Sequence, residues 1–213
     1  MKPSSLFATK TWKGDYFHFL QSAFEDKWKD CKYDFDDKWL MINNGVPKDT
    51  LKGIEVAPLV DEVLDFFKLK RDDFKDNGYD GFYYSIAELT AIYLAKDFDY
   101  LCWIQGDCRL SKPYDWVTPG IESLKKEDIS VVAPFSEVNT WHDKDGLDHF
   151  FSDQAFLIKV DEFRKPIYGI KGYMKEYPIY GGNYFEMMVG KYLHKENKYR
   201  KIITEAYYDH EVY

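Results

Sequence analysis

An acidic residue directly follows a short apolar run near the middle of the chain. The run extends from Tyr100 to Ile104, and Gln105-Gly106-Asp107 comes next. An apolar run of this length that stops at a polar turn is typical of a buried strand. Ligands of open α/β sheets bind beyond the carboxyl ends of strands, and hard divalent cations take carboxylate and phosphate oxygens as ligands. Asp107 therefore suggests a cation site for a diphosphate, and the simpler alternative is a solvated turn acid.

Other polar side chains lie at the ends of predicted strands. Thr9 and Thr11 belong to the first strand, Asn43 and Asn44 follow the second, and Asp153 precedes a later one. Because the ends of parallel strands meet at one edge of a sheet, we expect these groups to lie near Asp107. Each also has a simpler interpretation: threonine favours strands, asparagine favours turns, and Asp153 suits a helix N-cap or the surface.

The elements that must position these groups follow from the hydrophobic pattern. Strands are predicted at 6–12, 39–42, 100–104, 129–133, 155–160 and 201–204, and helices at 15–29, 60–67, 85–96 and from 183 onward. Ser85 and Glu88 fit a capping box, which predicts a helix start at Ser85. The charged segment 68–80 predicts a loop. This alternation predicts a three-layer α/β/α sandwich around a mixed, mostly parallel sheet.

Length and composition limit the function further. The 213 residues favour a single domain, 1–213, and leave open that the chain is a fragment of a longer one. A formal net charge of −8 argues against a nucleic-acid partner, and no apolar run is long enough to span a membrane. The three cysteines show no zinc spacing, which favours a reducing, cytoplasmic compartment. Aromatic residues make up 19% of the chain, and such rings suit sugars and nucleobases.

Several familiar motifs are absent from the sequence. It contains no P-loop, no GxGxxG after the first strand and no GxSxG elbow. These absences argue against P-loop nucleotidases, dinucleotide oxidoreductases and α/β-hydrolases. Two further polar segments remain as candidates: Trp141-His142, as a lid that faces an acceptor, and Gly181-Gly182-Asn183, as a helix start that favours an anion.

The order of these elements resembles the GT-A family of nucleotide-sugar glycosyltransferases, over nearly the whole chain. Within that family, the chain also resembles the N-terminal domain of a member encoded by a large chlorella virus. The resemblance implies a GT-A-like nucleotide-diphospho-sugar transferase fold. It also implies a hexosyltransferase that uses Mn²⁺ or Mg²⁺ to move glucose or a deoxyhexose from UDP to a glycan acceptor hydroxyl. For a viral protein, the compartment would be the host cytoplasm.

The resemblance also implies roles for individual residues. Asp107 matches the last, metal-binding acid of the DxD motif, whose first acid is replaced here by Gln105, a side chain that can bond a ribose hydroxyl or a water. Asp153 falls where inverting members place a catalytic base. The remaining matches concern the nucleotide and the metal: Thr9 and Thr11 on the first strand, Asn43 or Asn44 after the second, and His210 as a third metal ligand.

Two other functions stay open at this point. A nucleotidyltransferase uses the same metal and carboxylate chemistry, but it usually carries a Gly-rich basic loop that Leu6 to Gly14 lacks. A carbohydrate-binding module would use the aromatic side chains without any reaction. If the reaction is an inverting transfer, a carboxylate must take the acceptor proton, and a retaining transfer needs no base there.

Overall fold

The computed structural model describes residues 2–76, 79–136, 147–149, 151–170 and 184–210. Its strands are β1 (Ser5–Thr11), β2 (Asp37–Ile42), β3 (Ile54–Glu55), β4 (Lys75–Asp76), β5 (Tyr79–Asp80), β6 (Tyr100–Ile104), β7 (Cys108–Leu110), β8 (Ile129–Phe135), β9 (Leu147–Asp148), β10 (Ala155–Lys159) and β11 (Tyr199–His210). Its helices are α1 (Tyr16–Phe19), α2 (Ala23–Asp30), α3 (Val60–Phe67), α4 (Phe82–Leu94), α5 (Val117–Leu124), α6 (Val160–Phe163) and α7 (Phe185–Lys195), with 3₁₀ turns η1 (Ala57–Leu59) and η2 (Arg71–Phe74).

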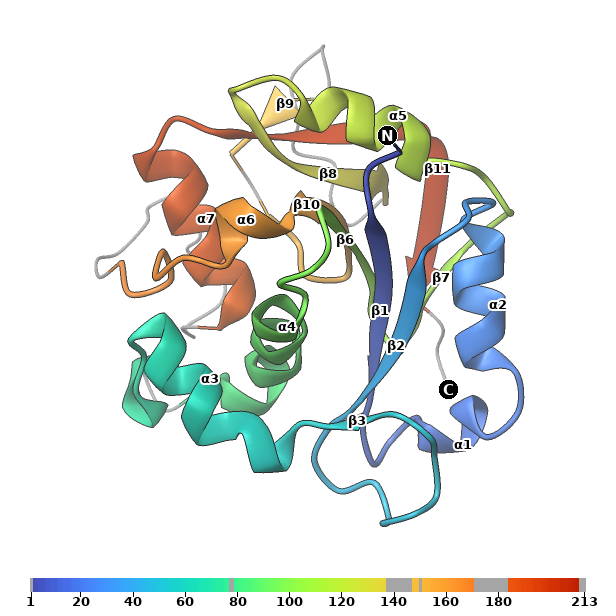
Figure 1. Ribbon diagram of the computed structural model, residues 1–213, viewed down its shortest axis with the longest axis vertical. Coiled ribbons are helices and arrows are strands. Elements are labelled where there is room, and N and C mark those ends of the chain that lie inside the picture. Colours follow the sequence, from blue (N-terminus) through green and yellow to red (C-terminus); the bar gives the residue numbers. More distant parts are fainter. Residues whose placement is uncertain (1, 77–78, 137–146, 150, 171–183, 211–213) are drawn as a thin grey trace.

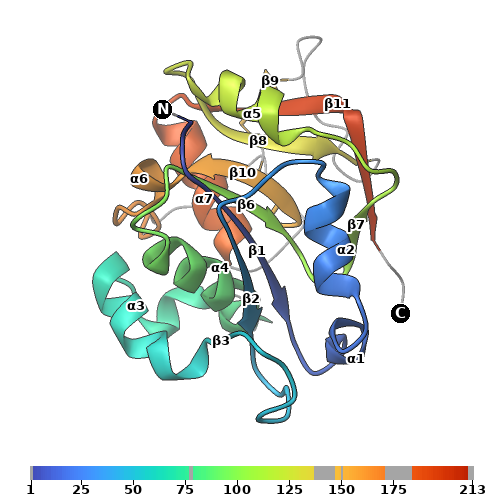
Figure 2. The same cartoon turned by 45° about the vertical axis from the view of Figure 1, so that its right-hand side comes forward.

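One large mixed sheet organises the described part of the chain. Its strand order is β3-β2-β1-β6-β10-β8-β11-β7, and β9 pairs with β11 beside this path. The strands β3, β2, β1, β6, β8 and β11 run in one direction, and β10, β9 and β7 run in the opposite one. Figure 2 shows the arrowheads of β1, β2 and β6 pointing the same way. The predicted mixed, mostly parallel sheet is therefore confirmed.

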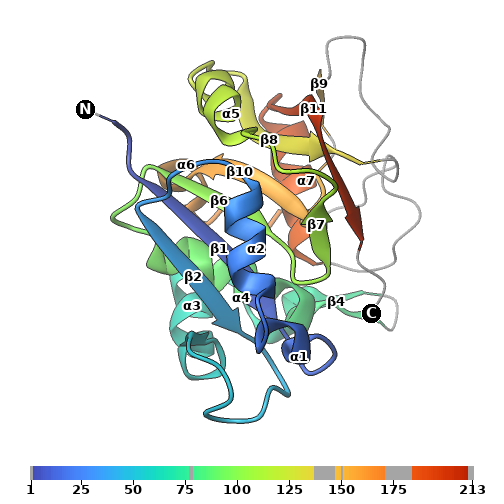
Figure 3. The same ribbon diagram turned by 90° about the vertical axis from the view of Figure 1, so that its right-hand side faces the viewer.

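Helices cover both faces of this sheet (Figure 1). The helices α3, α4, α6 and α7 bury side chains in one core with Leu6, Ala8 and Trp103 of the sheet. Helix α5 and the end of α2 bury side chains in a second core, with Phe7 and Cys102 on the opposite face of β1 and β6. Figure 3 shows α2 and α5 on the side of the sheet away from α3. The alternation of side chains along each strand thus separates two cores, and the three-layer arrangement is confirmed.

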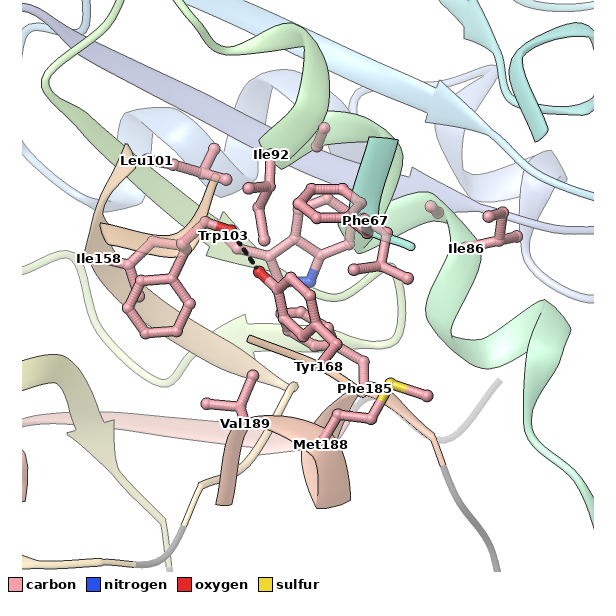
Figure 4. Close-up of a cluster of buried hydrophobic side chains, with 14 of the residues drawn as sticks. Phe67, Ile86, Ile92, Leu101, Trp103, Ile158, Tyr168, Phe185, Met188 and Val189 are labelled. Carbon is pink, nitrogen blue, oxygen red and sulfur yellow. Dashed lines mark hydrogen bonds between the residues drawn. The ribbon is translucent and has the colours of Figure 1, made fainter. Parts of the chain in front are cut away.

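Aromatic rings fill the core between the sheet and α7 (Figure 4). Trp103 is fully buried and stacks on Phe156, with ring centroids 6.1 Å apart. Phe185, the first residue of α7, packs against Phe156 and Tyr168 at 5.8 Å from each. The Tyr168 hydroxyl donates to the carbonyl of Phe163 at 2.7 Å, so this buried polar group is satisfied.

Several elements differ from the sequence-based expectation. The helix expected at 15–29 is two helices, α1 and α2, and the expected loop 68–80 contains η2 and the β4–β5 hairpin. The last strand continues through the tyrosine-rich segment to His210. Helix α4 starts earlier than Ser85, and its N-cap is Gly81, so the capping-box prediction is wrong. The strand β6 and the helix α3 have the predicted bounds.

No helix in the described ranges is long and apolar enough to cross a membrane. The three cysteines are free and buried. Cys102 is fully buried in the sheet, as its apolar surroundings in the sequence predict.

Candidate functional site

The ends of four strands meet at one edge of the sheet. The backbone pairing of β1 and β2 continues past both strands, since the Asn43 amide donates to the Thr11 carbonyl at 2.9 Å. The pairing of β6 with β10 also continues past these strands, since the Gln105 amide donates to the Gln154 carbonyl at 2.7 Å. Because β10 runs antiparallel to β6, the residues just before β10 lie beside those just after β6. The fold therefore gathers the polar segments 11–15, 43–44, 105–107 and 152–154.

A cavity of about 320 Å³ opens at this edge. Four short segments line it: Lys10, Trp12, Lys13 and Asp15 after β1; Asn43 and Asn44 after β2; Tyr83 and Tyr84 at the start of α4; and Gln105, Gly106 and Asp107 after β6. Its polar groups include both carboxylates and cations. Its aromatic rings are partly open to solvent, with 47% of Trp12, 49% of Tyr83 and 57% of Tyr84 exposed.

Asp107 lies half-buried in the wall of this cavity, beside a second acid that sequence reasoning did not single out. Asp15 is only 3% exposed. Its Oδ1 accepts the Thr11 hydroxyl and the Trp12 amide, each at 2.7 Å. Burial raises the pKa of Asp15, these two hydrogen bonds lower it, the negative charge of Asp107 raises it, and the positive charge of Lys27 lowers it, with a net rise. The two carboxylates thus interact across the cavity wall.

Gly106 permits this arrangement because it has no side chain. A Cβ atom at Gly106 would lie 2.4 Å from Asp15 Oδ2 and 2.4 Å from the Lys10 carbonyl oxygen. Neither distance is possible between real atoms that are not bonded. A glycine between Gln105 and Asp107 is therefore required for the loop after β6 to lie against the loop after β1.

Lys10, one of the residues that line the cavity, belongs to a buried ion pair. Lys10 Nζ lies 2.5 Å from Glu88 Oε1 and donates to the Tyr84 carbonyl at 2.8 Å. Burial raises the pKa of Glu88 to about 7, although the positive charge of Lys10 opposes this shift. Burial alone lowers the pKa of Lys10, but Glu88, Asp153 and Asp107 together raise it above its ordinary value. Lys10 therefore stays charged and links α4 to the acids of the site.

Asp153 lies half-buried, one residue before the Gln154 carbonyl that the Gln105 amide holds. Its charge raises the pKa of Lys10 and of Glu88, so it faces the same ion pair. It also faces Glu186 in the first turn of α7, whose pKa is raised by burial first and then by Asp153. The charge of Asp153 thus acts on both the ion pair and the first turn of α7, next to the loop that carries Gln105.

The predicted nucleotide residues have different surroundings. Asn43 and Asn44 line the cavity; the Asn43 side-chain amide donates to the Tyr83 carbonyl at 2.7 Å, and its Oδ1 accepts the Asn44 amide at 2.8 Å. Thr9 and Thr11 are fully buried on the face of β1 opposite Lys10. The Thr11 hydroxyl is used by Asp15. At this strand end, Lys10 and Trp12 line the cavity, and Thr9 and Thr11 do not.

The predicted metal ligand His210 ends β11, and the backbone register pairs it with Cys108, the neighbour of Asp107. Its side chain lies outside the described part of the structure. Trp141-His142 and Gly181-Gly182-Asn183 also lie outside the described residues. Among the residues that are described, no group of three or more His, Cys, Asp and Glu side chains surrounds a common point.

The sequence gives no role to several residues of the site, among them Lys10, Asp15 and Glu88. Lys10 lies between Thr9 and Thr11 in an otherwise apolar strand. A charged residue at such a buried position was the one signal that could have indicated its role. Asp15 read as the start of a helix, and Glu88 read as a capping residue. In each case the function of the side chain depends on a contact with a segment far away in the sequence, and local patterns do not show such contacts.

No protein-family profile matches the chain, and no curated protein matches it in sequence. Solved structures do match it in fold. Mouse xyloside xylosyltransferase 1, in its apo form, has a TM-score of 0.51 and 10% sequence identity, over 94% of this chain and 85% of that one. GalNAc-T7 with UDP, GalNAc and Mn²⁺ has a TM-score of 0.56 and 11% identity, over 99% of this chain and 43% of that one.

A third similar structure is glucosyl-3-phosphoglycerate synthase from Mycobacterium tuberculosis in complex with Mg²⁺ and UDP. Its TM-score is 0.52 at 11% identity, over 100% of this chain and 73% of that one. All three have the GT-A fold of nucleotide-sugar transferases, and the chain shares this fold.

Proposed function

We propose that the chain is a metal-dependent glycosyltransferase that moves a sugar from a UDP-sugar to a hydroxyl group of a glycan acceptor. The observation that carries the proposal is the cavity at the strand ends of a GT-A fold, with Asp107 in its wall. The sugar that we expect is glucose or a deoxyhexose. The resemblance to a member encoded by a large chlorella virus, and with it a host-cytoplasmic location, stays a prediction, because none of the three similar structures bears on it.

The cavity offers suitable groups for the nucleotide. Asn43 and Asn44 provide amides beside the end of β1, and Trp12, Tyr83 and Tyr84 provide exposed ring faces. Aromatic rings stack on planar bases and pack against sugar rings. We assign the base and ribose to this end of the cavity, and the diphosphate to the end beside Asp107. Gln105 lies between them in position to meet a ribose hydroxyl or a water.

The acidic side chains of the cavity are of a type that binds divalent cations. Asp107 and Asp15 supply hard oxygen donors in one cavity, and Mg²⁺ or Mn²⁺ commonly completes its coordination with substrate phosphates and water. When bound, the cation stabilises the charge that develops on the leaving diphosphate. Asp107 would hold it, and His210 is a further candidate by its backbone position.

Asp153 is the candidate base for an inverting transfer. Its neighbour Gln154 is fixed by the Gln105 amide and by the Tyr208 hydroxyl, which donates to Gln154 Oε1 at 2.8 Å. A carboxylate held at this point can take the proton of an acceptor hydroxyl while the sugar is transferred. Asp148, another acid near this edge in the sequence, binds the buried Arg200 through both of its oxygens, at 3.1 and 2.7 Å, and this bidentate ion pair engages both of them.

Calorimetry with UDP, with and without Mn²⁺, tests the proposal most directly. We expect UDP to bind tightly only when the metal is present. Binding of glycans without any affinity for UDP would contradict the proposal and support a carbohydrate-binding module. A screen of nucleotide-sugars for hydrolysis then identifies the donor, since UDP release from one of them is the expected result.

A further inference from the structure

The loop after β6 carries only one acid, and the structure supplies another from elsewhere. We infer that Asp15 is the second carboxylate of the cation site and takes the place of the acid that Gln105 lacks. This inference rests on the proposed function and concerns how the same site holds its metal. It assigns a ligand to a residue that the strand-end motif does not include.

The two oxygens of Asp15 have different surroundings. Oδ1 accepts two hydrogen bonds, from the Thr11 hydroxyl and the Trp12 amide. Oδ2 lies against Gly106 on the cavity side and makes no hydrogen bond within the described ranges. One oxygen therefore fixes the orientation of the carboxylate, and the other is directed at the cavity wall that contains Asp107.

Burial makes this arrangement costly without a cation. Asp15 is 97% removed from solvent, by its 3% exposed fraction, and lies near a second negative charge. A buried carboxylate is stable only when it is paired or coordinates a metal. Lys10 is already bound to Glu88 and the Tyr84 carbonyl, and the positive charge of Lys27, which donates to the carbonyl of Cys108, only partly offsets the burial of the Asp15 carboxylate. A divalent cation between Asp15 and Asp107 would neutralise both acids.

The close contact with Gly106 ties the two acids together. Because the missing side chain at Gly106 lets Asp15 Oδ2 approach the backbone just before Asp107, both carboxylates border the same part of the cavity. A purely structural role for Asp15, that of receiving the Trp12 amide in the turn after β1, requires Oδ1 alone. Because the carboxylate is planar, the two hydrogen bonds to Oδ1 also set the position of Oδ2 against Gly106 and leave this oxygen available to a cation.

The test is a measurement of Mn²⁺ affinity in the presence of UDP, in which the electron paramagnetic resonance signal of free Mn²⁺ reports how much metal is unbound. Asp15→Asn keeps the size of the side chain and an oxygen for Thr11 and Trp12, but removes the charge. We expect it to weaken Mn²⁺ binding at least about tenfold, the lower limit for losing even an outer partner of a metal. Asp36→Asn is the matched control, because Asp36 accepts the Ser5 amide and hydroxyl at the beginning of β1 in the same manner, far from the cavity.

A rescue variant separates metal binding from folding. Gln105→Asp places an acid two residues before Asp107, and we expect it to restore Mn²⁺ affinity in the Asp15→Asn background. A loss caused only by a weakened turn after β1 would not be restored by an acid at residue 105. If Asp15→Asn binds Mn²⁺ as the unmodified protein does while Asp107→Ala does not, the inference is overturned and the proposed function stands. If the unmodified protein shows no Mn²⁺-dependent binding of UDP, the proposed function itself fails.

A measurement on the unmodified protein decides the matter if Asp15→Asn does not fold. The protein is titrated with Mg²⁺ and UDP, and the ¹³C resonances of its aspartate carboxyl groups report which of them bind the metal. We expect the signals of Asp15 and Asp107 to shift together and that of Asp36 to stay constant. An unshifted Asp15 signal beside a shifted Asp107 signal overturns the inference.

Discussion

Asp107 is the residue on which the proposed chemistry depends most. It is half-buried in the cavity wall and contributes little to packing, so Asp107→Ala should keep the fold and its thermal stability. We expect this variant to lose Mn²⁺-dependent UDP binding, measured by calorimetry with and without the metal. Asp97→Ala, which removes an exposed acid from the connection between α4 and β6, is the control and should bind as the unmodified protein does. Unchanged metal-dependent affinity in Asp107→Ala would exclude Asp107 as a ligand.

Asp153 is expected to act on the acceptor rather than on the donor. Asp153→Asn preserves the shape of the side chain and removes its basicity, and loss of a positioned general base costs about 10²–10⁴-fold in rate. UDP-sugar affinity should stay nearly constant, because the base meets the acceptor hydroxyl. Transfer rate and donor affinity are measured side by side, with Asp161→Asn on α6 as the control. Turnover that stays within a few-fold of the original would point to a retaining mechanism or to another base.

The sequence predicted correctly that certain loops lie side by side, while the roles of their residues stay predictions. Gln105 and Asp107 on one loop and the Asn43-Asn44 turn line one cavity, as the convergence of strand ends requires. The expectation succeeded because strand ends are visible as abrupt changes from apolar to polar residues. It could not reveal Asp15, because the contact of Asp15 with Gly106 joins two loops that are distant in sequence.

Helix α4 contributes Glu88 to the buried ion pair with Lys10, and this predicts a pH dependence. The pKa of Glu88 is about 7 in the folded chain and 4.5 in its ordinary state, so between these values the folded chain binds more protons than the unfolded chain. The free energy of unfolding should therefore decrease as pH rises from about 4.5 to about 7. Glu88→Gln cannot ionise and should show a flatter profile across this window.

Urea unfolding between pH 4.5 and pH 7.5 measures this difference. Lys10 keeps its charge throughout the window, because its pKa is raised above the ordinary lysine value. Glu122→Gln, which changes an exposed acid paired with Lys125 on the surface, is the control and should keep the original slope. Parallel profiles for Glu88→Gln and the unmodified protein would show that folding does not raise the pKa of Glu88.

The edge formed by β1 and β2 should select the nucleobase. The side chain of Asn43 is fixed next to the end of β1 by the Tyr83 carbonyl and the Asn44 backbone amide, and a pocket of fixed donors and acceptors rejects bases with a different pattern. We expect UDP to bind at least about tenfold more tightly than GDP or ADP in the presence of Mn²⁺. Competition between the three nucleotides measures this preference. Equal affinities for UDP and GDP would contradict the assignment of the base to this edge.

Individual elements were predictable where the local pattern was strong. The apolar run of β6 and the amphipathic pattern of α3 gave the observed bounds. Helix α4 starts before its supposed capping box because Ser85 and Glu88 are buried within the helix. There the Ser85 hydroxyl donates to the Gly81 carbonyl and accepts the Phe185 amide, and Glu88 pairs with Lys10. Tertiary contacts thus use both residues differently from their local signal.

For the whole molecule, the sequence predicted the layers but not the order of the strands. The alternation of strands and helices is sufficient to predict a sandwich with helices on both faces. The insertion of β10 between β6 and β8, antiparallel to both, has no local signal, because it depends on which strands pair. This strand brings Asp153 to the edge that carries Asp107. The position of the candidate base is therefore a property of the complete sheet.

The core beneath the site should dominate the stability of the fold. Trp103 is fully buried between the sheet and α7, and its Nε1 has no hydrogen-bond partner among the described residues. Trp103→Ala should lower the free energy of unfolding by about 3–5 kcal/mol. Trp103→Phe should cost less, because it keeps a ring against Phe156 and removes the unsatisfied N–H group. Urea denaturation measures the free energy of unfolding of both variants. Equal losses in Trp103→Ala and Trp103→Phe would contradict the prediction.

The contact at Gly106 has a consequence for laboratory evolution of the donor preference. Every substitution at Gly106 adds an atom at 2.4 Å from Asp15 Oδ2 and from the Lys10 carbonyl, and the backbone carbonyl has no free rotation to yield. In a library that randomises Gly106, most variants should therefore fail to form the cavity. Diversity is better placed at Gln105 and Trp12, which border the same cavity with side chains that have room to change. If the proposed donor specificity is to be changed, substitutions at Gln105 and Trp12 are therefore open to it, while residue 106 has to remain glycine.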